Sequence, residues 1–247
     1  MKIAIFAAGT GGHIFPALSI AEEFKRDDVI FFASSRELEK KIYKETGYKV
    51  IYLDIDGFRG KSIFKKLIWP ISFIYNLFKV ICILINNNPK KVLLMGGYIS
   101  SLGFVAGKIL CKILYIHEQN SILGTSNNVA KFFSKKVFTG FKLGLSNEYN
   151  SGNPIRKEIR GSSYFDVPDK DKILIIGGSQ GSKFFNDNLP QVLVESDISE
   201  KIIFQKGSHI INFESSNIEF IDFIDDLSKI FAKTKFVICR SGASTVA

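Results

Sequence analysis

Twice in this chain, a short apolar run ends in a cluster of glycines that opens a helical pattern. The first run is residues 2–8, before the glycines of residues 9–12; the second is residues 172–176, before those of residues 177–181. Such runs are typical of buried parallel strands, and their alternation with helical stretches predicts an α/β fold. Because the pattern restarts, we expect two Rossmann-like domains that face a cleft.

The boundaries of the expected elements follow from the same alternation. Strands are predicted at residues 2–8, 29–33, 49–53, 91–95, 113–116, 136–139, 172–176, 201–205, 217–220 and 235–239. Helical patterns cover residues 16–24, 37–45, 183–194 and 227–233, and Pro16 is expected near the first turn of its helix. Residues 151–170 hold two prolines and two glycines, so we interpret them as a linker between domains at residues 1–150 and 171–247.

The glycine clusters are suited to phosphate, because backbone N–H groups at a helix N-terminus converge there without side chains in the way. The first cluster lacks the third glycine of a dinucleotide fingerprint, since Ile14 occupies that position, and no acidic residue closes the second strand near Ser34. This argues against a nicotinamide enzyme. Residues 177–181 and 240–245 together favour a nucleotide diphosphate, although each motif alone is compatible with a plain turn. Residues 57–62 end like a phosphate-binding Walker motif but do not have its spacing, because Ile55 stands where the first glycine would be. This argues against an NTPase.

Four polar residues, His117 to Asn120, directly follow the predicted strand at residues 113–116. Ligands bind at the carboxyl ends of strands in open α/β sheets. The tetrapeptide is therefore a candidate site, although His117 taken alone is better interpreted as a structural histidine.

The net charge of +9 is concentrated near residues 59–66 and 131–136, beside apolar residues. We interpret this charge as favouring an anionic membrane surface, with ordinary solvated faces as the alternative. Nucleic acid is a third possible partner, but no sequence pattern typical of nucleic-acid binding supports it. The N-terminus does not resemble a signal peptide. Cys82, Cys111 and Cys239 have no metal or disulfide spacing, which predicts a reducing compartment.

Residues 67–85 are mostly apolar, with Lys79 as the only charged residue, and they are long enough to span a membrane, although Lys79 and Asn76 count against a simple span. A helix in the membrane interface and an ordinary buried helix are the other interpretations. We favour the interfacial helix, because the segment lies inside one α/β domain whose flanking strands should share a sheet.

Eight motifs occur in a recognisable order. They are GTGGHIFP (9–16), GFRGK (57–61), MGGYIS (95–100), HEQN (117–120), GNPIR (152–156), GGSQG (177–181), FIDD (223–226) and CRSGAST (239–245). In these motifs the chain resembles the MurG family, the peptidoglycan N-acetylglucosaminyltransferases of glycosyltransferase family 28, which have the GT-B fold. The resemblance covers essentially the whole chain.

The resemblance implies an inverting transfer of N-acetylglucosamine from UDP-GlcNAc to the MurNAc 4-hydroxyl of lipid I, forming lipid II, with no cofactor or metal. It implies a membrane-binding acceptor domain, a UDP-GlcNAc-binding second domain and a peripheral location on the cytoplasmic face of the inner membrane. His13 is the leading candidate for the base, with Glu118 as its rival; a positioning or diphosphate-binding role and a structural role for His13 stay open. Donor contacts are expected from Thr10, Gly11, Gly12, Asn120, Arg156, Ser179, Ile224, Ala243, Ser244, Thr245 and Val246.

The family continues beyond its SGAxT motif with further donor-binding residues, whereas this chain stops at Ala247. We therefore expect an incomplete second domain and an inactive 247-residue chain. The alternatives are a fragment that only binds membrane and another UDP-sugar enzyme of the same fold, such as a UDP-GlcNAc 2-epimerase. An epimerase would not need the apolar, basic stretch before residue 85.

Overall fold

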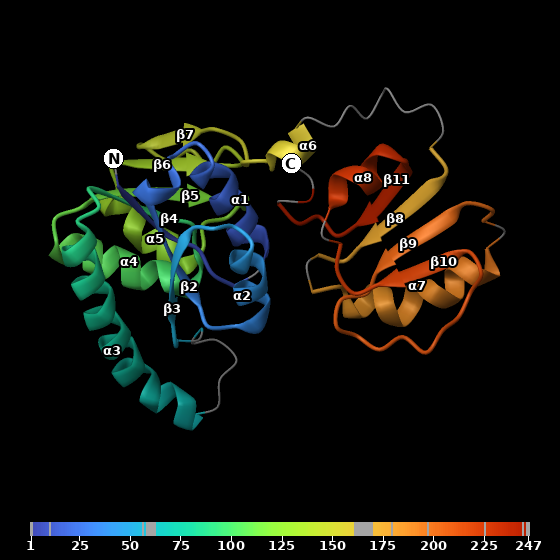
Figure 1. Ribbon diagram of the computed structural model, residues 1–247, viewed down its shortest axis with the longest axis horizontal. Coiled ribbons are helices and arrows are strands. Elements are labelled where there is room, and N and C mark those ends of the chain that lie inside the picture. The colour runs from blue at the N-terminus through green and yellow to red at the C-terminus, as the bar shows by residue number, and fades with distance from the viewer. Residues whose placement is uncertain are drawn as a thin grey trace. The chain divides into compact units, whose positions relative to one another are not determined.

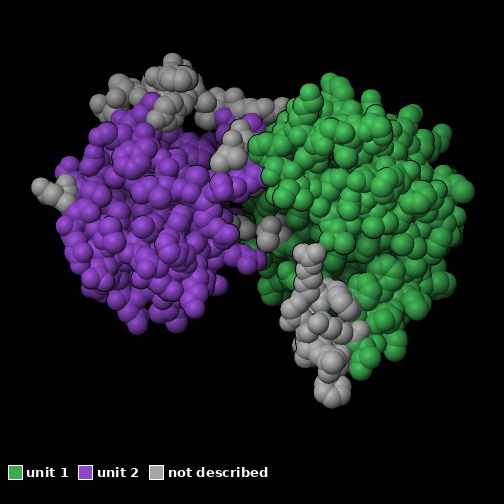
Figure 2. Space-filling model, turned by 180° about the vertical axis from the view of Figure 1, so that it is seen from behind, with its two compact units in different colours: residues 1–154, 247 green, residues 155–246 purple. Residues whose placement is uncertain are grey.

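The computed structural model describes residues 2–9, 11–55, 57, 63–160, 170–178, 180–196, 198–224, 226–243 and 245, without the side chains of residues 63–66, 158 and 160. The chain forms two compact units, residues 1–154 and residues 155–246 (Figures 1 and 2). Both are α/β, as expected.

The first unit is built on a parallel sheet of seven strands in the order β3-β2-β1-β4-β5-β6-β7. Their bounds are β1 Ile3–Phe6, β2 Val29–Ser34, β3 Lys49–Leu53, β4 Lys91–Leu94, β5 Ile113–Glu118, β6 Lys136–Thr139 and β7 Glu148–Asn150. The order reverses on either side of β1. Such a switch point leaves a crevice at the carboxyl ends of the strands, which is where ligands bind in open α/β sheets.

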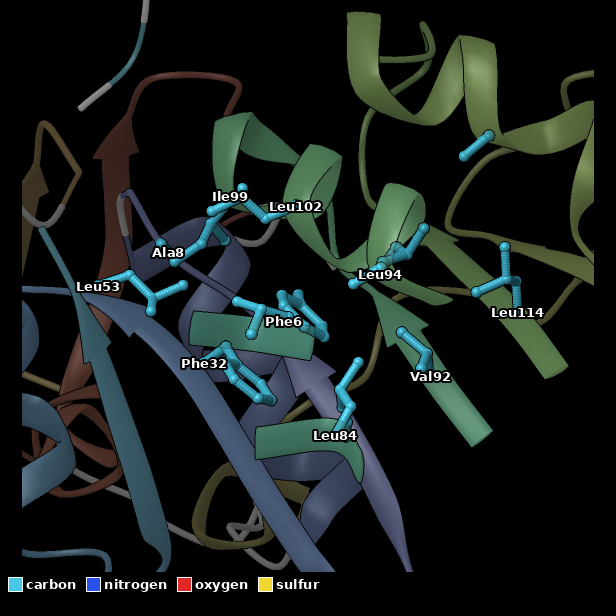
Figure 3. Packing of buried hydrophobic residues seen from close by; sticks show 14 of the residues in the cluster. Phe6, Ala8, Phe32, Leu53, Leu84, Val92, Leu94, Ile99, Leu102 and Leu114 are labelled. Atoms are coloured by element: carbon cyan, nitrogen blue, oxygen red, sulfur yellow. The ribbon is translucent and has the colours of Figure 1, made fainter. Parts of the chain in front are cut away.

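Helices cover both faces of this sheet. They are α1 Gly11–Ala21, α2 Glu37–Lys44, α3 Ile63–Asn87, α4 Gly97–Ile109 and α5 Thr125–Ala130, with short 3-10 turns at Arg26–Asp28 and Lys131–Phe133. Alternate residues of β1 point to opposite faces, so Phe6 packs with α3 and α4 while Ile5 packs with α1. The rings of Phe6 and Phe32 are stacked at 4.3 Å, next to Leu84 of α3 (Figure 3).

Helix α3 is divided lengthwise into a buried and an exposed apolar face. Val80 and Leu84 are fully buried in the core, and the helix packs against α4. Large apolar side chains on the other face are 56–70% exposed: Leu67, Ile68, Ile71, Ile74, Tyr75, Phe78 and Ile85. The N-terminal half of α3 extends away from the sheet (Figure 1). Its segment Leu67–Asn87 is long and apolar enough to cross a membrane, and 17% of its most apolar stretch is buried.

The second unit has a parallel sheet of four strands in the order β10-β9-β8-β11. Its elements are α6 Lys157–Arg160, β8 Lys172–Ile176, α7 Lys183–Glu195, β9 Lys201–Gln205, β10 Ile218–Ile221, α8 Leu227–Ala232 and β11 Thr234–Cys239. One apolar cluster includes Phe204 and residues of α7, and another joins Leu174 to α8. Ser182 caps α7 by accepting from the amide of Phe185 at 3.4 Å.

Several local expectations were wrong. Helix α1 begins at Gly11, so Pro16 lies inside it rather than near its first turn. Because proline has no N–H, this removes one bond of the helical ladder. The polar strand β7 was not expected, and α6 lies inside the segment interpreted as a linker. Strand β5 continues to Glu118, two residues beyond its predicted end, because His117 and Glu118 still pair with Phe138 and Thr139 of β6.

Candidate active site

The carboxyl ends of β1, β4 and β5 bring three segments of the first unit together. The first glycine loop, residues 9–12, follows β1; Gly96 and Gly97 follow β4; and the HEQN segment, residues 117–120, lies at the end of β5. These segments are distant in sequence and meet at the switch point of the sheet. The arrangement agrees with the ligand site predicted at the ends of these strands.

His13 lies on the first turn of α1, with its ring held between glycines. A Cβ on Gly96 would lie 3.1 Å from His13 Cε1, and one on Gly9 would lie 3.8 Å from His13 Cδ2. Gly96 and Gly97 have φ of 94° and 74°, a conformation that glycine adopts without strain. The missing side chains therefore give the imidazole room. His13 itself is partly exposed, as a proton-transfer group must be.

A chain of polar contacts runs inward from His13. Its Nδ1 is 2.9 Å from Oε1 of Gln119, and Nε2 of that amide is 3.1 Å from Nδ1 of His117. Nε2 of His117 lies 3.4 Å from the carbonyl oxygen of Gly152. Burial lowers the pKa of His117 to about 4, partly offset by its hydrogen bond to Gly152 and by Glu118. His117 is therefore neutral at physiological pH.

Glu118 is buried and its carboxylate is occupied by the surrounding loop. Oε1 accepts from the backbone and side-chain amides of Asn120, at 3.1 and 2.9 Å. Oε2 accepts from the backbone of Gly124 at 3.0 Å and from Nδ2 of Asn127 at 2.9 Å. Four donors on one carboxylate suit an anchor for the loop after β5. This geometry favours His13 over Glu118 as the proton acceptor.

The GNP segment, residues 152–154, follows β7 and supports the HEQN segment. Nδ2 of Asn153 donates to the carbonyl of Gln119 at 3.1 Å, next to the contact between Gly152 and His117. A Cβ on Gly140 would lie 2.2 Å from Oδ1 of Asn153, so only glycine at position 140 leaves room for that side chain. Two motifs whose first residues are 35 positions apart in the sequence thus form one structure.

Sequence reasoning missed Glu39, a fully buried residue of α2. Its carboxylate accepts from the backbone amides of Gly9 and Ser34, each at 2.9 Å, and from the Ser34 hydroxyl. It therefore ties the first glycine loop to the end of β2. The signal was present, since Glu39 lies five residues after a strand end that has no acidic residue of its own.

In the second unit, the loops after β8 and β9 touch backbone to backbone. A Cβ on Gly181 would lie 2.1 Å from the carbonyl oxygen of Lys206, and one on Gly207 would lie 2.1 Å from that of Gln180. Side chains at either glycine would force the loops apart. Nε2 of Gln205 also donates to the carbonyl of Gly178 at 3.2 Å. Gly207 and Gln205 are further supports that sequence reasoning did not identify.

Seven of the predicted donor residues lie in the described part of the chain, and four lie outside it. Gly11 and Gly12 open α1, Asn120 is bound to Glu118, and Arg156 immediately precedes α6. Ala243 and Thr245 lie in the turn after β11, where the Thr245 amide donates to the Gly242 carbonyl at 2.8 Å, while the side chain of Ile224 is buried in the core of its unit. Thr10, Ser179, Ser244 and Val246 lie outside the described residues, as does most of GFRGK.

Residues 3–139 match the N-terminal domain of glycosyltransferase family 28, and residues 172–247 match its C-terminal domain. The chain belongs to glycosyltransferase family 28. The predicted family and GT-B fold class are thereby confirmed.

Relatives of known name cover almost the whole chain. A UDP-N-acetylglucosamine–N-acetylmuramyl-(pentapeptide) pyrophosphoryl-undecaprenol N-acetylglucosamine transferase of Histophilus somni is 32% identical over 99% of this chain and 74% of its own length. The protein of that name from Shewanella frigidimarina is 32% identical over 99% of this chain and 72% of its own length. This family 28 chain thus spans about three quarters of these relatives.

Solved structures agree on the fold. The crystal structure of Acinetobacter baumannii MurG superposes with a TM-score of 0.71 at 28% identity, over 99% of this chain and 75% of that one. A putative UDP-N-acetylglucosamine 2-epimerase from Listeria monocytogenes superposes with a TM-score of 0.66 at 12% identity, over 98% of this chain and 75% of that one. The second likeness shows only that family 28 shares its fold with other proteins.

Proposed function

We propose that this protein transfers N-acetylglucosamine from UDP-GlcNAc to the MurNAc 4-hydroxyl of lipid I, with inversion, to form lipid II in peptidoglycan synthesis. The observation that carries the proposal is the match over 99% of the chain to relatives whose name specifies this donor and this acceptor. The imidazole at the switch point supplies the group that the reaction needs.

His13 acts as the general base in this proposal. Inversion at the anomeric carbon requires one displacement, in which the acceptor hydroxyl loses its proton as it attacks. A partly exposed imidazole at the carboxyl ends of the strands suits that task near neutral pH. Its Nδ1 is engaged with Gln119, which leaves Nε2 for the proton. Glu118, with its four donors, shapes the loop beside the base.

The glycine turns of the second unit bind the departing UDP. Residues 177–181 and 240–245 follow two adjacent parallel strands, β8 and β11. Backbone amides at such turns stabilise the negative charge that develops on a leaving diphosphate. Donor contacts carried over from the family to Arg156, Ser179, Ala243, Ser244, Thr245 and Val246 belong to this part of the proposal, whereas the contact carried over to Thr10 belongs to the first glycine loop.

The exposed face of α3 holds the protein on an anionic membrane, where a polyprenyl-linked acceptor resides. Residues 57–147 contain 13 lysines and arginines but a single acidic residue, Glu118. Glu118 is buried, and every other formal charge in the segment is positive. An apolar helix face beside such charge is suited to the interface of a bilayer with anionic lipid. The cytoplasmic face of the inner membrane is the location that this proposal requires.

The test is an assay of lipid II formation from UDP-GlcNAc and lipid I in detergent. It is run with the 247-residue chain and with a hybrid in which residues 1–247 are continued by the C-terminal quarter of the Histophilus somni relative. The hybrid covers the full length of that relative, so its failure to make lipid II would overturn the proposal. Formation of UDP-ManNAc without lipid I would instead identify the epimerase alternative.

A further inference from the structure

The starting point is the carbonyl oxygen of Gly152, which can only accept a hydrogen bond. His117 is 2% exposed and burial lowers its pKa, so its ring carries a single N–H. That N–H is on Nε2, which faces the Gly152 oxygen at 3.4 Å. Nδ1 of His117 is then a lone pair that can only accept.

The orientation of the Gln119 amide follows from this lone pair. Its nitrogen must face Nδ1 of His117, at 3.1 Å, and its oxygen is then directed to Nδ1 of His13, at 2.9 Å. The turned amide would place an oxygen against the unprotonated Nδ1 of His117, where no hydrogen is available. Because Gln119 is 2% exposed and its backbone carbonyl accepts from Asn153, the side chain has no room to turn towards solvent.

His13 is the end of this chain of contacts. A carbonyl-type oxygen accepts, so Nδ1 of His13 must carry the hydrogen. In the neutral ring Nε2 is then unprotonated, and within the described part of the chain it has no hydrogen-bond partner. Gly96 lies beside the Nδ1 and Cε1 edge of the ring and Gly97 lies near Cδ2.

We propose that Gln119 and His117 are positioning residues that hold His13 as its Nδ1–H tautomer, so that Nε2 is always the proton acceptor. The inference deepens the proposed function, since it assumes that His13 removes the acceptor proton. Neither residue touches substrate in this scheme. Their effect is to prevent His13 from adopting the Nε2–H form, which has no lone pair in the place where the proton must go.

The tautomer can be measured without any activity. The protein is labelled with ¹⁵N-histidine, and long-range proton–nitrogen spectra are recorded at about pH 8, where an ordinary histidine is neutral. Variants at His13 and His117 assign two signals, and exposed His209 in the second unit is an internal reference. We expect His13 to be protonated at Nδ1 and His117 at Nε2. A His13 that is protonated at Nε2, or that averages both forms as a free ring does, would overturn the proposal.

Two substitutions at position 119 test the cause. Gln119→Leu removes both contacts, so His13 should lose its single tautomer while His209 is unchanged. Gln119→Glu keeps an acceptor for Nδ1 of His13 and should preserve the Nδ1–H form of that ring, while its second oxygen faces Nδ1 of His117 and should bring a proton onto that nitrogen. Gln191→Leu, on the exposed side of α7, is the matched control and should alter neither. A His13 that keeps its Nδ1–H form in Gln119→Leu shows that something else holds it.

Kinetics then separate positioning from structure. In the hybrid chain, Gln119→Leu should lower kcat by roughly 10- to 100-fold with the KM for UDP-GlcNAc within about twofold, because only the base is misaligned. Gln119→Glu should recover most of that loss. Equal kcat in all three proteins would refute the positioning role. If the parent hybrid makes no lipid II while the spectra show the expected tautomers, the reaction is wrong but the tautomer assignment stands.

Discussion

The carboxylate of Glu39 holds the backbone amide of Gly9 from a helix that begins 28 residues later in the chain. The same carboxylate accepts two hydrogen bonds from Ser34. Three donors and one fully buried acid thus set the position of the first glycine loop against the end of β2. The loop that precedes His13 therefore depends on a side chain outside every motif shared with the family.

Glu39→Ala should destabilise the first unit by about 2–4 kcal/mol, because it leaves these buried donors without an acceptor. Urea denaturation at neutral pH measures the change. Glu37→Ala is the control on the same helix; its side chain is 90% exposed, so its effect should stay within about 0.5 kcal/mol. Equal losses in the two variants would mean that the contacts of Glu39 are energetically unimportant.

His13→Ala should lower kcat of the hybrid chain by about 100-fold or more, which is the usual contribution of a positioned base. The KM for UDP-GlcNAc should change little, since the imidazole acts on the acceptor. Steady-state assays of lipid II formation measure both constants. His209→Ala, at an exposed position of the second unit, should behave as the parent. A near-normal kcat for His13→Ala would exclude this residue as the base.

Glu118→Gln should mainly reduce stability, by about 1–3 kcal/mol, because one carboxamide oxygen cannot serve four donors. Per folded molecule, kcat should fall less than about tenfold. The two quantities are measured on one preparation, by urea denaturation and by the lipid II assay. Unchanged stability together with a 100-fold loss of kcat would instead identify Glu118 as the base.

Stability should fall with acid in a window set by His117. Its folded pKa, about 4, is below the ordinary 6.5, so between these values the unfolded chain binds more protons than the folded one. Its contribution is complete above about pH 6.5 and is lost as the pH falls towards 4, by up to about 3 kcal/mol. Urea denaturation at several pH values should show a shallower slope for His117→Asn and an unchanged one for His209→Asn.

The titration of Glu148 affects stability at lower pH, so its effect can be distinguished from that of His117. Hydrogen bonds from Thr139 and from the amides of Leu143 and Leu145 lower its pKa to about 2. Its contribution is therefore lost only below its ordinary value of 4.5. A slope in wild type that begins below pH 4.5, with none between 4.5 and 6.5, would contradict the assignment to His117.

The protein should bind vesicles that contain anionic lipid, and added salt should weaken that binding because it screens the lysines. Phe78→Ser removes a side chain that is 69% exposed on α3 and should reduce partitioning about 10- to 100-fold. Phe184→Ser, equally exposed in the second unit, is the matched control and should have no such effect. Co-sedimentation measures both. Retention after alkaline carbonate washing would indicate that α3 spans the bilayer.

The sheets were predictable because buried parallel strands are nearly continuous apolar runs. Strands β3, β6, β8 and β9 begin and end at the predicted residues. Strand β7 could not be found in this way, because Glu148 and its neighbours are polar and pair with β6 through the backbone. The start of α1 was missed because Pro16 suggested a first turn, whereas glycines from Gly11 onward already had helical geometry.

The candidate site was predictable only as far as its motifs. The glycine loop, His13 and the HEQN segment were identified from sequence, but a pattern cannot say which atoms they share. Gln119 was predicted only as part of the HEQN segment, with no role of its own, although it connects His13 with His117. Asn153 and Gly140 were also out of reach, because their fit depends on a close approach between strands β6 and β7.

The contacts of Gly152 and Asn153 determine where the length of this chain can vary. The backbone leaves the first unit through the same residues that support His117 and Gln119. An insertion or deletion before Pro154 would therefore shift the histidine pair, whereas one after Ile155 would fall in the second unit. Exchange of whole second units between relatives, by recombination or by engineering, is best tolerated when the junction lies just beyond Pro154.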